Sequence, residues 1–486
     1  MATKKILFVV PEIKSMFGTE KGIPIHPHVG IAYLVSVLKR NNFQYQIIDC
    51  GVEKDWPIKL KTAIKNFSPD IVGVTGFSYA YKYLYQTIKK IKSITNIPII
   101  LGGPHVSANK NKILKETKVN FAMYGESEIS IIDFLKAFSK KNPDFSKVPN
   151  LIWKNKNKVI INSPAPLIRD LDQLAFPDYE SFNLSAYPCF REKIIPIITS
   201  RGCPYGCNYC SVRLSMGQSF RPRSPQNVID EITYWYKKGF TNFDFNDDCF
   251  TLDVNRAEAI CDLIIKNKLH IKFQLYNGIR VNNITLKLLK KLKKAGCFFI
   301  AYGCESGSQK ILDRIKKNIT LDQVTQAVKF TNQAKIKHAV NFIVGHQDET
   351  YQDALETFKF AKNLNCNYVN FYNLVPYPGT EVYDWAIKHA HFLIPKNQYL
   401  KNVSYRDINP IFETKEFTKD QRIKIMKKGF NLYERKLYRF RFGKILGTIF
   451  YLLTRIPFFG HLSRKLVYDN KFFNKLFSIL ISSSKK

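Results

Sequence analysis

Over residues 1–140, short apolar segments alternate with segments in which apolar side chains recur at helical spacing. The apolar segments predict buried strands at Lys5–Val10, Gln46–Asp49, Ile71–Thr75, Ile99–Leu101 and Phe121–Tyr124. The helical spacing predicts helices at Gly30–Arg40, Ile58–Asn66, Tyr81–Ile94, Asn111–Glu116 and Ser127–Phe138. Such alternation is typical of α/β domains with a doubly wound parallel sheet covered on both faces. Ligands of such sheets bind at the carboxyl ends of the strands.

A second alternation follows a connector. Residues 141–192 are punctuated by prolines and contain a short strand pair at 151–161. Beyond them, strands are predicted at Ile194–Thr199, Asn242–Asn246, Ile271–Tyr276, Phe298–Tyr302, Ala339–Val344 and Tyr368–Tyr372, with helices between them. Six such strands predict a partial or complete parallel β/α barrel over residues 193–400, with its chemistry at the strand ends. Residues 401–486 form a helical, basic region rich in Phe and Tyr.

The composition narrows the class of protein. Hydrophobic residues make up 45% of the 486 residues and charged residues 23%, which excludes a disordered chain. The longest apolar run near the end, Ile445–Leu453, is interrupted by Thr448 and is shorter than the about 20 residues of a spanning helix. Ten cysteines in a chain that starts without a signal-like segment indicate reduced thiols or metal ligands. We therefore expect a cytoplasmic protein.

Three of the ten cysteines, Cys203, Cys207 and Cys210, fall within eight residues. They follow the strand predicted at Ile194–Thr199, on a loop that contains Gly and Pro. Thiolates this close on a loop suit a soft metal centre. Three protein ligands leave one coordination position open, which suits catalysis, and no fourth Cys or His follows within twenty residues to complete a zinc knuckle.

The spacing Cys203-x-x-x-Cys207-x-x-Cys210, with Tyr209 before the last cysteine and Thr199-Ser200-Arg201-Gly202 before the first, resembles the signature of radical S-adenosylmethionine (SAM) enzymes. The resemblance implies a [4Fe–4S] cluster held by the three thiolates, with SAM chelating the fourth iron. Reduction by a one-electron donor such as flavodoxin or ferredoxin would split SAM to a 5′-deoxyadenosyl radical, which abstracts a hydrogen atom from carbon. The protein would hold SAM against the cluster and exclude water.

Polar residues at the following strand ends are the candidates for SAM contacts, together with Tyr209. The segment Tyr302–Gln309 resembles the family's Gly-x-Glu-Ser-Gly segment, which implies that Glu305 accepts a hydrogen bond from the SAM ammonium. Capping of the next helix is the alternative role for Glu305. Asn277 and Arg280 follow the third strand and would contact polar groups of SAM, or else belong to an ordinary solvated loop.

Two further segments bear on the barrel. The acidic run Asp244–Asp248 would bind a cation, a ribose or the substrate, or would simply precede a helix capped by Asp253. The segment Gly345–Thr350 resembles a Gly-x-Pro-Gly-Glu-Thr turn of the family but has Gln347-Asp348 in place of Pro-Gly.

Small residues gather at the strand ends of the N-terminal sheet, in Gly76-Phe77-Ser78, Gly102-Gly103-Pro104-His105 and Gly125-Glu126. They would let the backbone approach a bulky ligand closely, although plain turns use the same residues. Together with Pro27-x-x-Gly30 and Leu171–Pro177, they resemble the branch of the family with an N-terminal cobalamin-binding domain. The resemblance implies that cobalamin is contacted by Ser78, Gly102, Gly103, Pro104, His105, Gly125 and Glu126.

The motif Asp-x-His-x-x-Gly, by which many cobalamin domains supply an axial histidine, is absent. The resemblance therefore implies a corrinoid without a histidine ligand, or with another residue beneath the cobalt. His105 is the nearest candidate for such a ligand, and its alternative role is that of a loop hydrogen-bonder.

The pairing of the two domains resembles enzymes that transfer methyl groups to unactivated carbon, with SAM as both methyl donor and radical source. Cyclases that rearrange a carbon skeleton, acting on a tetrapyrrole or lipid-like substrate, are the first alternative. An RNA-modifying enzyme and a cluster-binding sensor are the others, although a sensor need not hold SAM and no RNA-binding module is recognisable. The sequence does not identify the small-molecule or lipid-like substrate.

The formal net charge of +36 concentrates towards the end of the chain. Residues 421–486 hold sixteen Lys and Arg against two acids and are rich in Phe. A basic, aromatic, non-spanning segment is typical of a helix on an anionic membrane surface. A helical lid packed on the barrel is the equal alternative, with contact to RNA behind both.

Overall fold

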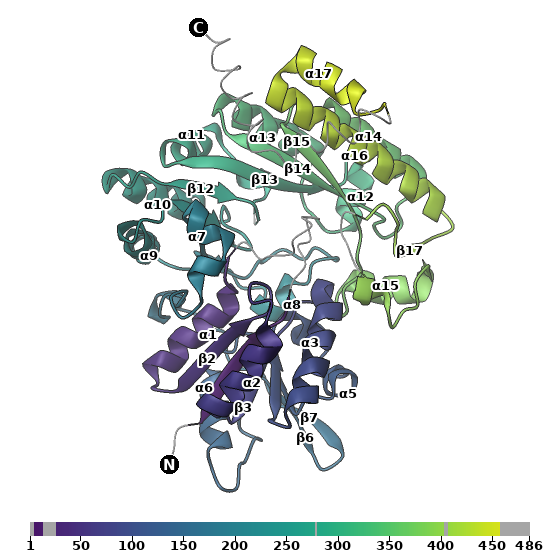
Figure 1. Ribbon diagram of the computed structural model, residues 1–486. Coiled ribbons are helices and arrows are strands. Elements are labelled where there is room, and N and C mark those ends of the chain that lie inside the picture. Colours follow the sequence, from purple (N-terminus) through teal and green to yellow (C-terminus); the bar gives the residue numbers. More distant parts are fainter. Residues whose placement is uncertain (1–3, 13–25, 278, 403–406, 457–486) are drawn as a thin grey trace.

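The first strand shows how the sequence builds a sheet covered on both faces. In β1 (Lys5–Val10), Ile6 and Phe8 pack into one hydrophobic core, whereas Leu7 and Val9 pack into another. The computed structural model describes residues 4–12, 26–277, 279–402 and 407–456. In this part of the chain the N-terminal sheet domain lies against the open side of a second α/β domain (Figure 1).

The N-terminal sheet has seven strands in the order β2-β1-β3-β4-β5-β6-β7. Strands β1 to β5 are parallel, and their bounds agree with the predicted strands within about two residues: β2 (Gln44–Asp49), β3 (Ile71–Thr75), β4 (Ile99–Gly102) and β5 (Phe121–Met123). The hairpin β6 (Leu151–Asn155) and β7 (Lys158–Ile161), predicted as part of the connector, adds to this sheet through antiparallel pairing of β6 with β5. The sheet therefore continues beyond residue 140.

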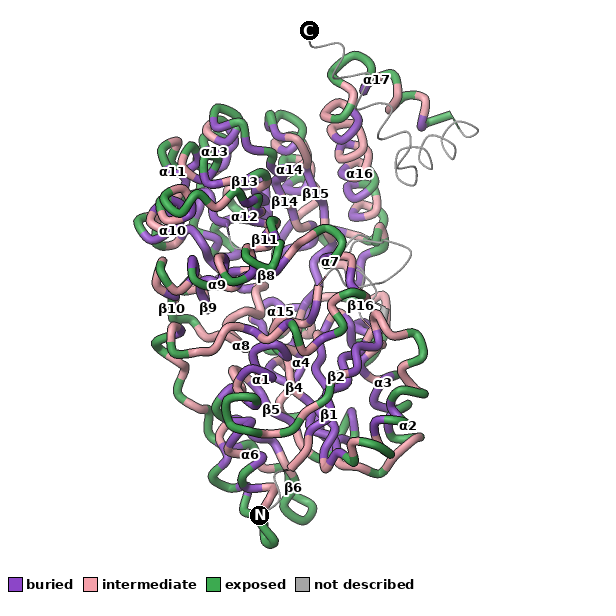
Figure 2. The backbone as a smooth tube through the Cα atoms, turned by 60° about the vertical axis from the view of Figure 1, so that its left-hand side comes forward, coloured by how far each residue is buried: buried purple, intermediate pink, exposed green. Residues whose placement is uncertain are grey.

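Helices cover both faces of this sheet, as its two hydrophobic cores require (Figures 1 and 2). They are α1 (Val29–Arg40), α2 (Trp56–Phe67), α3 (Tyr81–Ile94), α4 (Pro104–Ala108), α5 (Ile113–Thr117) and α6 (Ser130–Phe138), with the 3₁₀ turn η1 (Ser78–Ala80) before α3. The connector that follows contains η2 (Leu171–Gln173), η3 (Leu184–Ala186) and α7 (Pro188–Glu192).

The second sheet has six parallel strands in the order β8-β11-β12-β13-β14-β15, which makes an open, partial barrel. Its strands are β8 (Ile194–Ile197), β11 (Asn242–Phe245), β12 (Lys272–Leu275), β13 (Cys297–Glu305), β14 (Lys337–Val344) and β15 (Tyr368–Asn373). The helices and 3₁₀ turns around them are α8 (Val212–Met216), α9 (Pro225–Lys237), α10 (Val254–Lys266), η4 (Val281–Asn283), α11 (Leu286–Lys294), α12 (Gln309–Arg314), α13 (Leu321–Gln333), α14 (Tyr351–Asn363), α15 (Glu381–His389) and η5 (Tyr399–Asn402). Two short antiparallel pairs complete it: β9 (Ser200–Arg201) with β10 (Arg221–Pro222), and β16 (His391–Phe392) with β17 (Phe412–Glu413).

The C-terminal region supplies two helices, α16 (Lys419–Phe442) and α17 (Lys444–Leu453). Helix α16 packs along β15 and α14, and a side chain at its Gly429 would lie 2.5 Å from the Phe371 ring of β15. Figure 2 shows its buried stripe towards the barrel. Helix α16 thus packs on the barrel, which agrees with the helical lid, one of the two alternatives for this region. The aromatic residues of 457–486 lie outside the described residues, and none of the described helices is long and apolar enough to cross a membrane.

Candidate functional site

The loop that carries the three cysteines is anchored by the acidic residues at the end of β11. The Asp247 carboxylate accepts hydrogen bonds from the Thr199 amide (2.6 Å), the Thr199 hydroxyl (2.5 Å) and the Ser200 hydroxyl (2.6 Å). Asp248 accepts one from the Gly202 amide at 3.0 Å. These two members of the acidic run therefore hold the loop, and Asp253 caps α10 as the sequence allowed.

Glycine is required at position 202 for the loop to turn. Its φ is +81°, and a Cβ there would come within 2.3 Å of the Ser219 carbonyl oxygen. Since Ser219 lies just before β10, the Gly202 turn allows β9 and β10 to pair closely and starts the cysteine loop.

The three cysteines are free thiols on one short loop, with Cys207 buried and Cys203 and Cys210 partly exposed. A hydrogen bond with Cys249 lowers the pKa of Cys203 to about 6, whereas burial raises the pKa of Cys210 to about 11. Among the described residues, no three His, Cys, Asp or Glu side chains converge on one metal-ion position. Thiolates that hold an iron–sulfur cluster each bind a different iron, so the donor set fits a cluster without such convergence.

Beside this loop, the barrel encloses a pocket of about 330 Å³ that brings together Tyr209, Cys210, Asn277 and Glu305. All four were candidates from the sequence, although they come from three separate strand ends. Glu305 ends β13 with a φ of +76°, a left-handed conformation that is uncommon for non-glycine residues. The pocket also contains residues that the sequence did not single out: Tyr276, Asn341, Tyr372, Asn373 and Tyr377.

Lys317, which the sequence did not single out, forms an ion pair with Glu305. Its Nζ lies 2.8 Å from the Glu305 Oε1 and 3.3 Å from the Tyr209 hydroxyl, and it is buried. Although burial opposes its charge, the attraction to Glu305 raises the pKa of Lys317 above its usual range. The residue stands among the exposed Arg314 and Lys316, so nothing in the local sequence distinguishes it.

Arg280 lies apart from this pocket, against the cysteine loop. Its Nη1 donates to the Cys207 sulfur at 3.7 Å, and its guanidinium stacks 3.5 Å from the centre of the Tyr205 ring. Of the polar groups predicted to contact SAM, the pocket therefore includes Tyr209, Asn277 and Glu305 but not Arg280.

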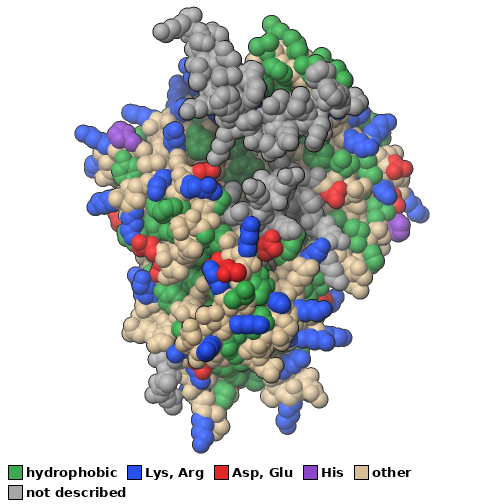
Figure 3. Space-filling view, in the orientation of Figure 1, with side chains coloured by type: hydrophobic (Ala, Val, Ile, Leu, Met, Phe, Trp, Pro, Cys, Tyr) green, Lys and Arg blue, Asp and Glu red, His purple; other side chains and the backbone are tan. Residues whose placement is uncertain are grey.

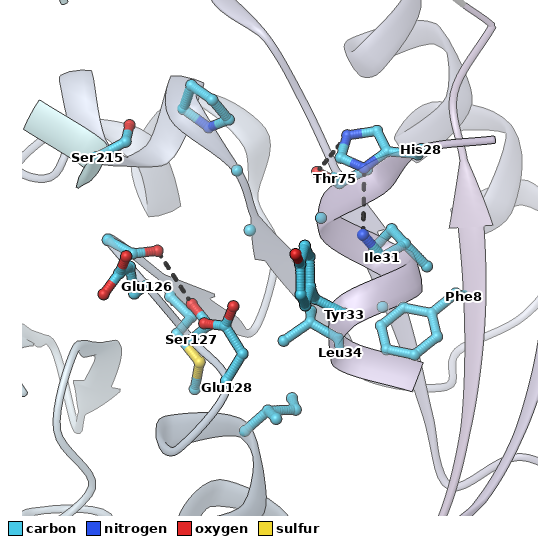
Figure 4. A pocket seen from close by; sticks show the side chains of 18 of the residues that line it. Phe8, His28, Ile31, Tyr33, Leu34, Thr75, Glu126, Ser127, Glu128 and Ser215 are labelled. Atoms are coloured by element: carbon cyan, nitrogen blue, oxygen red, sulfur yellow. Dashed lines mark hydrogen bonds between the residues drawn. The ribbon is translucent and has the colours of Figure 1, made fainter. Parts of the chain in front are cut away.

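A second cavity, of about 210 Å³, lies at the carboxyl ends of β1, β3, β4 and β5 (Figure 4). Its lining includes Gly102, Gly103, Pro104, Gly125 and Glu126, all candidates from the sequence, and is otherwise mostly apolar. A Cβ on Gly102 would meet no atom closer than 3.9 Å, so a side chain there would fill the cavity instead of clashing with its wall. Glycines at these strand ends leave the backbone open to close approach by a ligand in this cavity.

His105 and Ser78 do not line this cavity. The His105 Nδ1 lies 3.1 Å from the Ser78 hydroxyl, and the ring packs edge-on against Tyr81 and Tyr85. Burial lowers the pKa of His105 to about 4. This histidine is therefore a neutral packing residue behind the strand ends.

A different histidine, His28, lines the cavity and was not identified from the sequence. Figure 4 shows it between Thr75 and Ile31. Its Nδ1 accepts the Ile31 amide proton at 3.2 Å, so in the neutral ring the proton sits on Nε2, which faces Thr75 at 3.5 Å. Burial lowers the pKa of His28 to about 4. Its position caps the first turn of α1, which is the only local signal that could have identified it.

Buried ion pairs join this cavity to the cysteine loop. Glu126 accepts hydrogen bonds from both Nη atoms of Arg221 (2.7 and 2.8 Å) and from Arg201 (3.2 Å), while Arg201 also pairs with Glu128 at 2.7 Å. The Glu126 carboxylate, a candidate for cofactor contact, is thus engaged between the two domains.

One segment contributes side chains to both cavities. Arg201, Ser215 and Met216 line the N-terminal cavity, whereas Tyr209 and Cys210 line the barrel pocket. The three cysteines therefore lie on a segment that borders both cavities.

Comparison with known proteins agrees with this two-cavity arrangement. Residues 197–361 match the model of the radical SAM superfamily, and residues 23–134 match the model of the B12 binding domain. The chain is 33% identical over 434 residues to an uncharacterized methyltransferase of Pyrococcus horikoshii, covering 88% of this chain and 92% of that protein. It is 26% identical over 428 residues to an anaerobic magnesium-protoporphyrin IX monomethyl ester cyclase of Cereibacter sphaeroides, covering 86% of this chain and 68% of that one.

Among solved structures, the fold is similar to that of the radical SAM methyltransferase TsrM from Kitasatospora setae, with cobalamin and a [4Fe–4S] cluster bound. The TM-score is 0.67 at 18% sequence identity, over 78% of this chain and 74% of that one.

Proposed function

The chain belongs to the B12-binding branch of the radical SAM superfamily, and on that premise we propose that it transfers a methyl group to an unactivated carbon of a small organic substrate. As a member of this branch it is an enzyme whose cofactors are a [4Fe–4S] cluster, SAM and cobalamin. The observation that carries the proposal is the segment 201–216, which contains the three cysteines and contributes side chains to both cavities.

Cys203, Cys207 and Cys210 are the residues proposed to hold the cluster. When bound, the cluster and SAM supply a carbon-centred radical and the corrinoid supplies a transferable methyl group. The task of the surrounding chain is to place these groups beside one substrate carbon and to exclude water. Asp247 and Asp248 serve this task by fixing the path of the loop through hydrogen bonds to three of its residues, Thr199, Ser200 and Gly202.

Glu305 is proposed to receive the ammonium of SAM, because its carboxylate lines the barrel pocket. Lys317 does not line the pocket and is proposed to hold the Glu305 carboxylate and the Tyr209 hydroxyl in place. Tyr209 and Asn277 line the same pocket as Glu305 and add a hydroxyl and an amide.

Gly102, Gly103, Pro104, Gly125 and Glu126 are proposed to contact cobalamin. His28 would face the corrinoid as a hydrogen-bond donor, because its Nδ1 is engaged by the Ile31 amide. Ser78 and His105 are proposed to stabilise the strand ends from behind, through the hydrogen bond between them.

The products formed from SAM test the proposal. The anaerobically reconstituted wild-type chain, supplied with reductant and corrinoid, should form both 5′-deoxyadenosine and S-adenosylhomocysteine. Cys207→Ala should abolish 5′-deoxyadenosine, whereas Cys261→Ala, which removes a buried thiol of α10 away from the loop, should leave it unchanged. Normal cleavage by Cys207→Ala would reject the cluster assignment.

The relative named as a cyclase makes skeletal rearrangement the second candidate. A cyclase needs only the radical from SAM, so 5′-deoxyadenosine without any S-adenosylhomocysteine would favour cyclisation over methyl transfer.

We further propose a cytoplasmic location with a flavodoxin- or ferredoxin-like reductant. The ten cysteines are all free thiols, as a reducing compartment favours. The substrate is proposed to be a small or lipid-like molecule.

Contact with the anionic inner face of a membrane is proposed through α17. Ile445, Leu446, Ile449 and Leu452 of α17 are between 49% and 75% exposed, and α17 lies at the top of Figure 1, where Figure 3 shows apolar side chains on the surface. Exposed Arg441, Lys444 and Arg455 flank this surface, and cations next to an apolar stripe complement anionic lipid.

Co-sedimentation with vesicles that contain phosphatidylglycerol tests this contact. Ile445→Asp/Leu452→Asp should release the protein, whereas Ile58→Asp, at an exposed apolar position of α2, should not. Unchanged binding by the double variant would reject the membrane role.

A further inference from the structure

Arg280 is a buried cation that faces a cysteine sulfur. It precedes η4, its residue exposure is 6%, and its guanidinium is held on three sides. Nη2 donates to the backbone carbonyls of Lys317 and Asn318, the planar group stacks on Tyr205, and Nη1 points to the Cys207 sulfur at 3.7 Å. Its orientation is therefore set by the loop after α12 and by the cysteine loop together.

Among the described residues, the partners of this guanidinium are two carbonyls, a ring and a sulfur, and none of them is a carboxylate. By contrast, the neighbouring Lys317 is neutralised by Glu305. A buried positive charge without a counterion is costly, and an arginine remains charged at any ordinary pH. Nη1 points to the Cys207 sulfur, so negative charge at this sulfur would supply the counterion.

We propose that Arg280 is a positioning residue for the cluster: its guanidinium, held against the Cys207 sulfur, favours the reduced state. Reduction brings one electron from the external reductant into the cluster, whose charge becomes more negative by one unit. A fixed cation at a ligand sulfur stabilises that state more than the oxidised one, so it raises the reduction potential. This role replaces the contact with SAM that the sequence suggested, since Arg280 does not line the barrel pocket.

The inference rests on the cluster proposed for Cys203, Cys207 and Cys210. Three variants separate charge from shape. Arg280→Gln removes the charge, Arg280→Lys keeps it, and Lys316→Gln removes one charge from the exposed side chain of the adjoining segment. For each reconstituted protein, iron content is measured and the midpoint potential of the cluster is followed by electron paramagnetic resonance.

We expect Arg280→Gln to lower the equilibrium constant for reduction of the cluster at least tenfold. For a one-electron step this corresponds to a midpoint potential about 59 mV more negative. Arg280→Lys and Lys316→Gln should stay close to wild type. If Arg280→Gln assembles no cluster, an Arg280→Lys protein with a wild-type midpoint potential still supports the proposed role of the positive charge.

An unchanged midpoint in Arg280→Gln would overturn the inference, and so would equal shifts in Arg280→Gln and Arg280→Lys. Loss of the cluster in both, with wild-type circular dichroism, would also overturn it, because shape and not charge would then matter. A wild-type chain without any iron would instead reject the proposed cluster itself.

Discussion

Replacing Lys317 by methionine removes one half of the buried ion pair beside the cysteine loop. The Lys317 Nζ and the Glu305 Oε1 are 2.8 Å apart, and their side chains are only 7% and 10% exposed. At an effective dielectric constant of about 20, two unit charges at this distance attract by about 6 kcal/mol, part of which offsets their desolvation. Loss of one partner leaves the other charge buried and unpaired, which costs about 3–5 kcal/mol. We expect Lys317→Met to lower the free energy of unfolding of the apoprotein by that amount.

The double variant Lys317→Met/Glu305→Gln should recover most of this loss, because no unpaired charge remains. Lys310→Met is the matched control, since its pair with Asp353 has a 64% exposed lysine and should contribute about 0–1 kcal/mol. Urea unfolding followed by circular dichroism measures all four proteins.

The same change should weaken SAM binding, because it removes the cation that holds the Glu305 carboxylate in place at the pocket. A hydrogen bond to a charged group contributes about 1.5–3 kcal/mol, which corresponds to a roughly 10- to 150-fold higher Kd for SAM in the cluster-loaded protein. Equilibrium dialysis with labelled SAM measures this. A Lys317→Met protein with wild-type SAM affinity, or with less than about 1 kcal/mol of destabilisation, would refute the role given to the pair.

Three other predictions concern the cysteine loop, the domain contact and the N-terminal sheet. Asp247→Asn replaces the carboxylate that binds Thr199 and Ser200, so the reconstituted protein should lose iron on gel filtration; full retention of iron would contradict the anchoring role. Arg221→Met leaves Glu126 with one partner and should lower the free energy of unfolding by about 3–5 kcal/mol in a urea titration, whereas a loss below about 1 kcal/mol would show that the interdomain pair contributes little. Because the folded chain holds His105 neutral with a pKa near 4, against 6.5 when exposed, the unfolded chain binds more protons between these values and stability falls as pH drops from 6.5 to 4. His105→Gln should flatten that fall by up to about 1.4 kcal/mol per pH unit in urea titrations, and an equally steep fall in the variant would show that His105 is not responsible.

The fold could be predicted closely where a strand is a continuous apolar run, as in β1 and β3. In β3, all five residues from Ile71 to Thr75 are buried, so the run stands out from the amphipathic helices around it. The hairpin at 151–161 was recognised as a strand pair but not as part of the sheet. Its pairing with β5 is a contact between segments about 30 residues apart, and Val159 and Ile161 remain exposed, so its pattern does not show which sheet it joins.

The candidate site was predictable where residue types are unusual and less so where they are common. Three cysteines in eight residues, a Gly-Gly-Pro segment and Glu305 stand out in the sequence. Lys317 does not, because lysines are frequent in this chain and only the fold shows that this one is buried beside Glu305.

His105 and Arg280 show what position in the chain leaves open. Each follows a strand in the expected place, yet the direction of the side chain decides its role. His105 turns towards Ser78 and Tyr81, and Arg280 turns towards Cys207. Position in the chain identifies the strand end but not the cavity that a side chain faces.

The central claim is that one chain holds an iron–sulfur cluster on the cysteine loop and a corrinoid in the N-terminal cavity. The most direct measurement is the content of iron and corrinoid per chain after anaerobic reconstitution with excess hydroxocobalamin. We expect about four irons and one corrinoid per chain for the wild type. Cys207→Ala should lose only the iron, and Gly102→Leu should lose only the corrinoid. Absence of any bound corrinoid in the wild type, or loss of corrinoid from Cys207→Ala but not from Gly102→Leu, would contradict it.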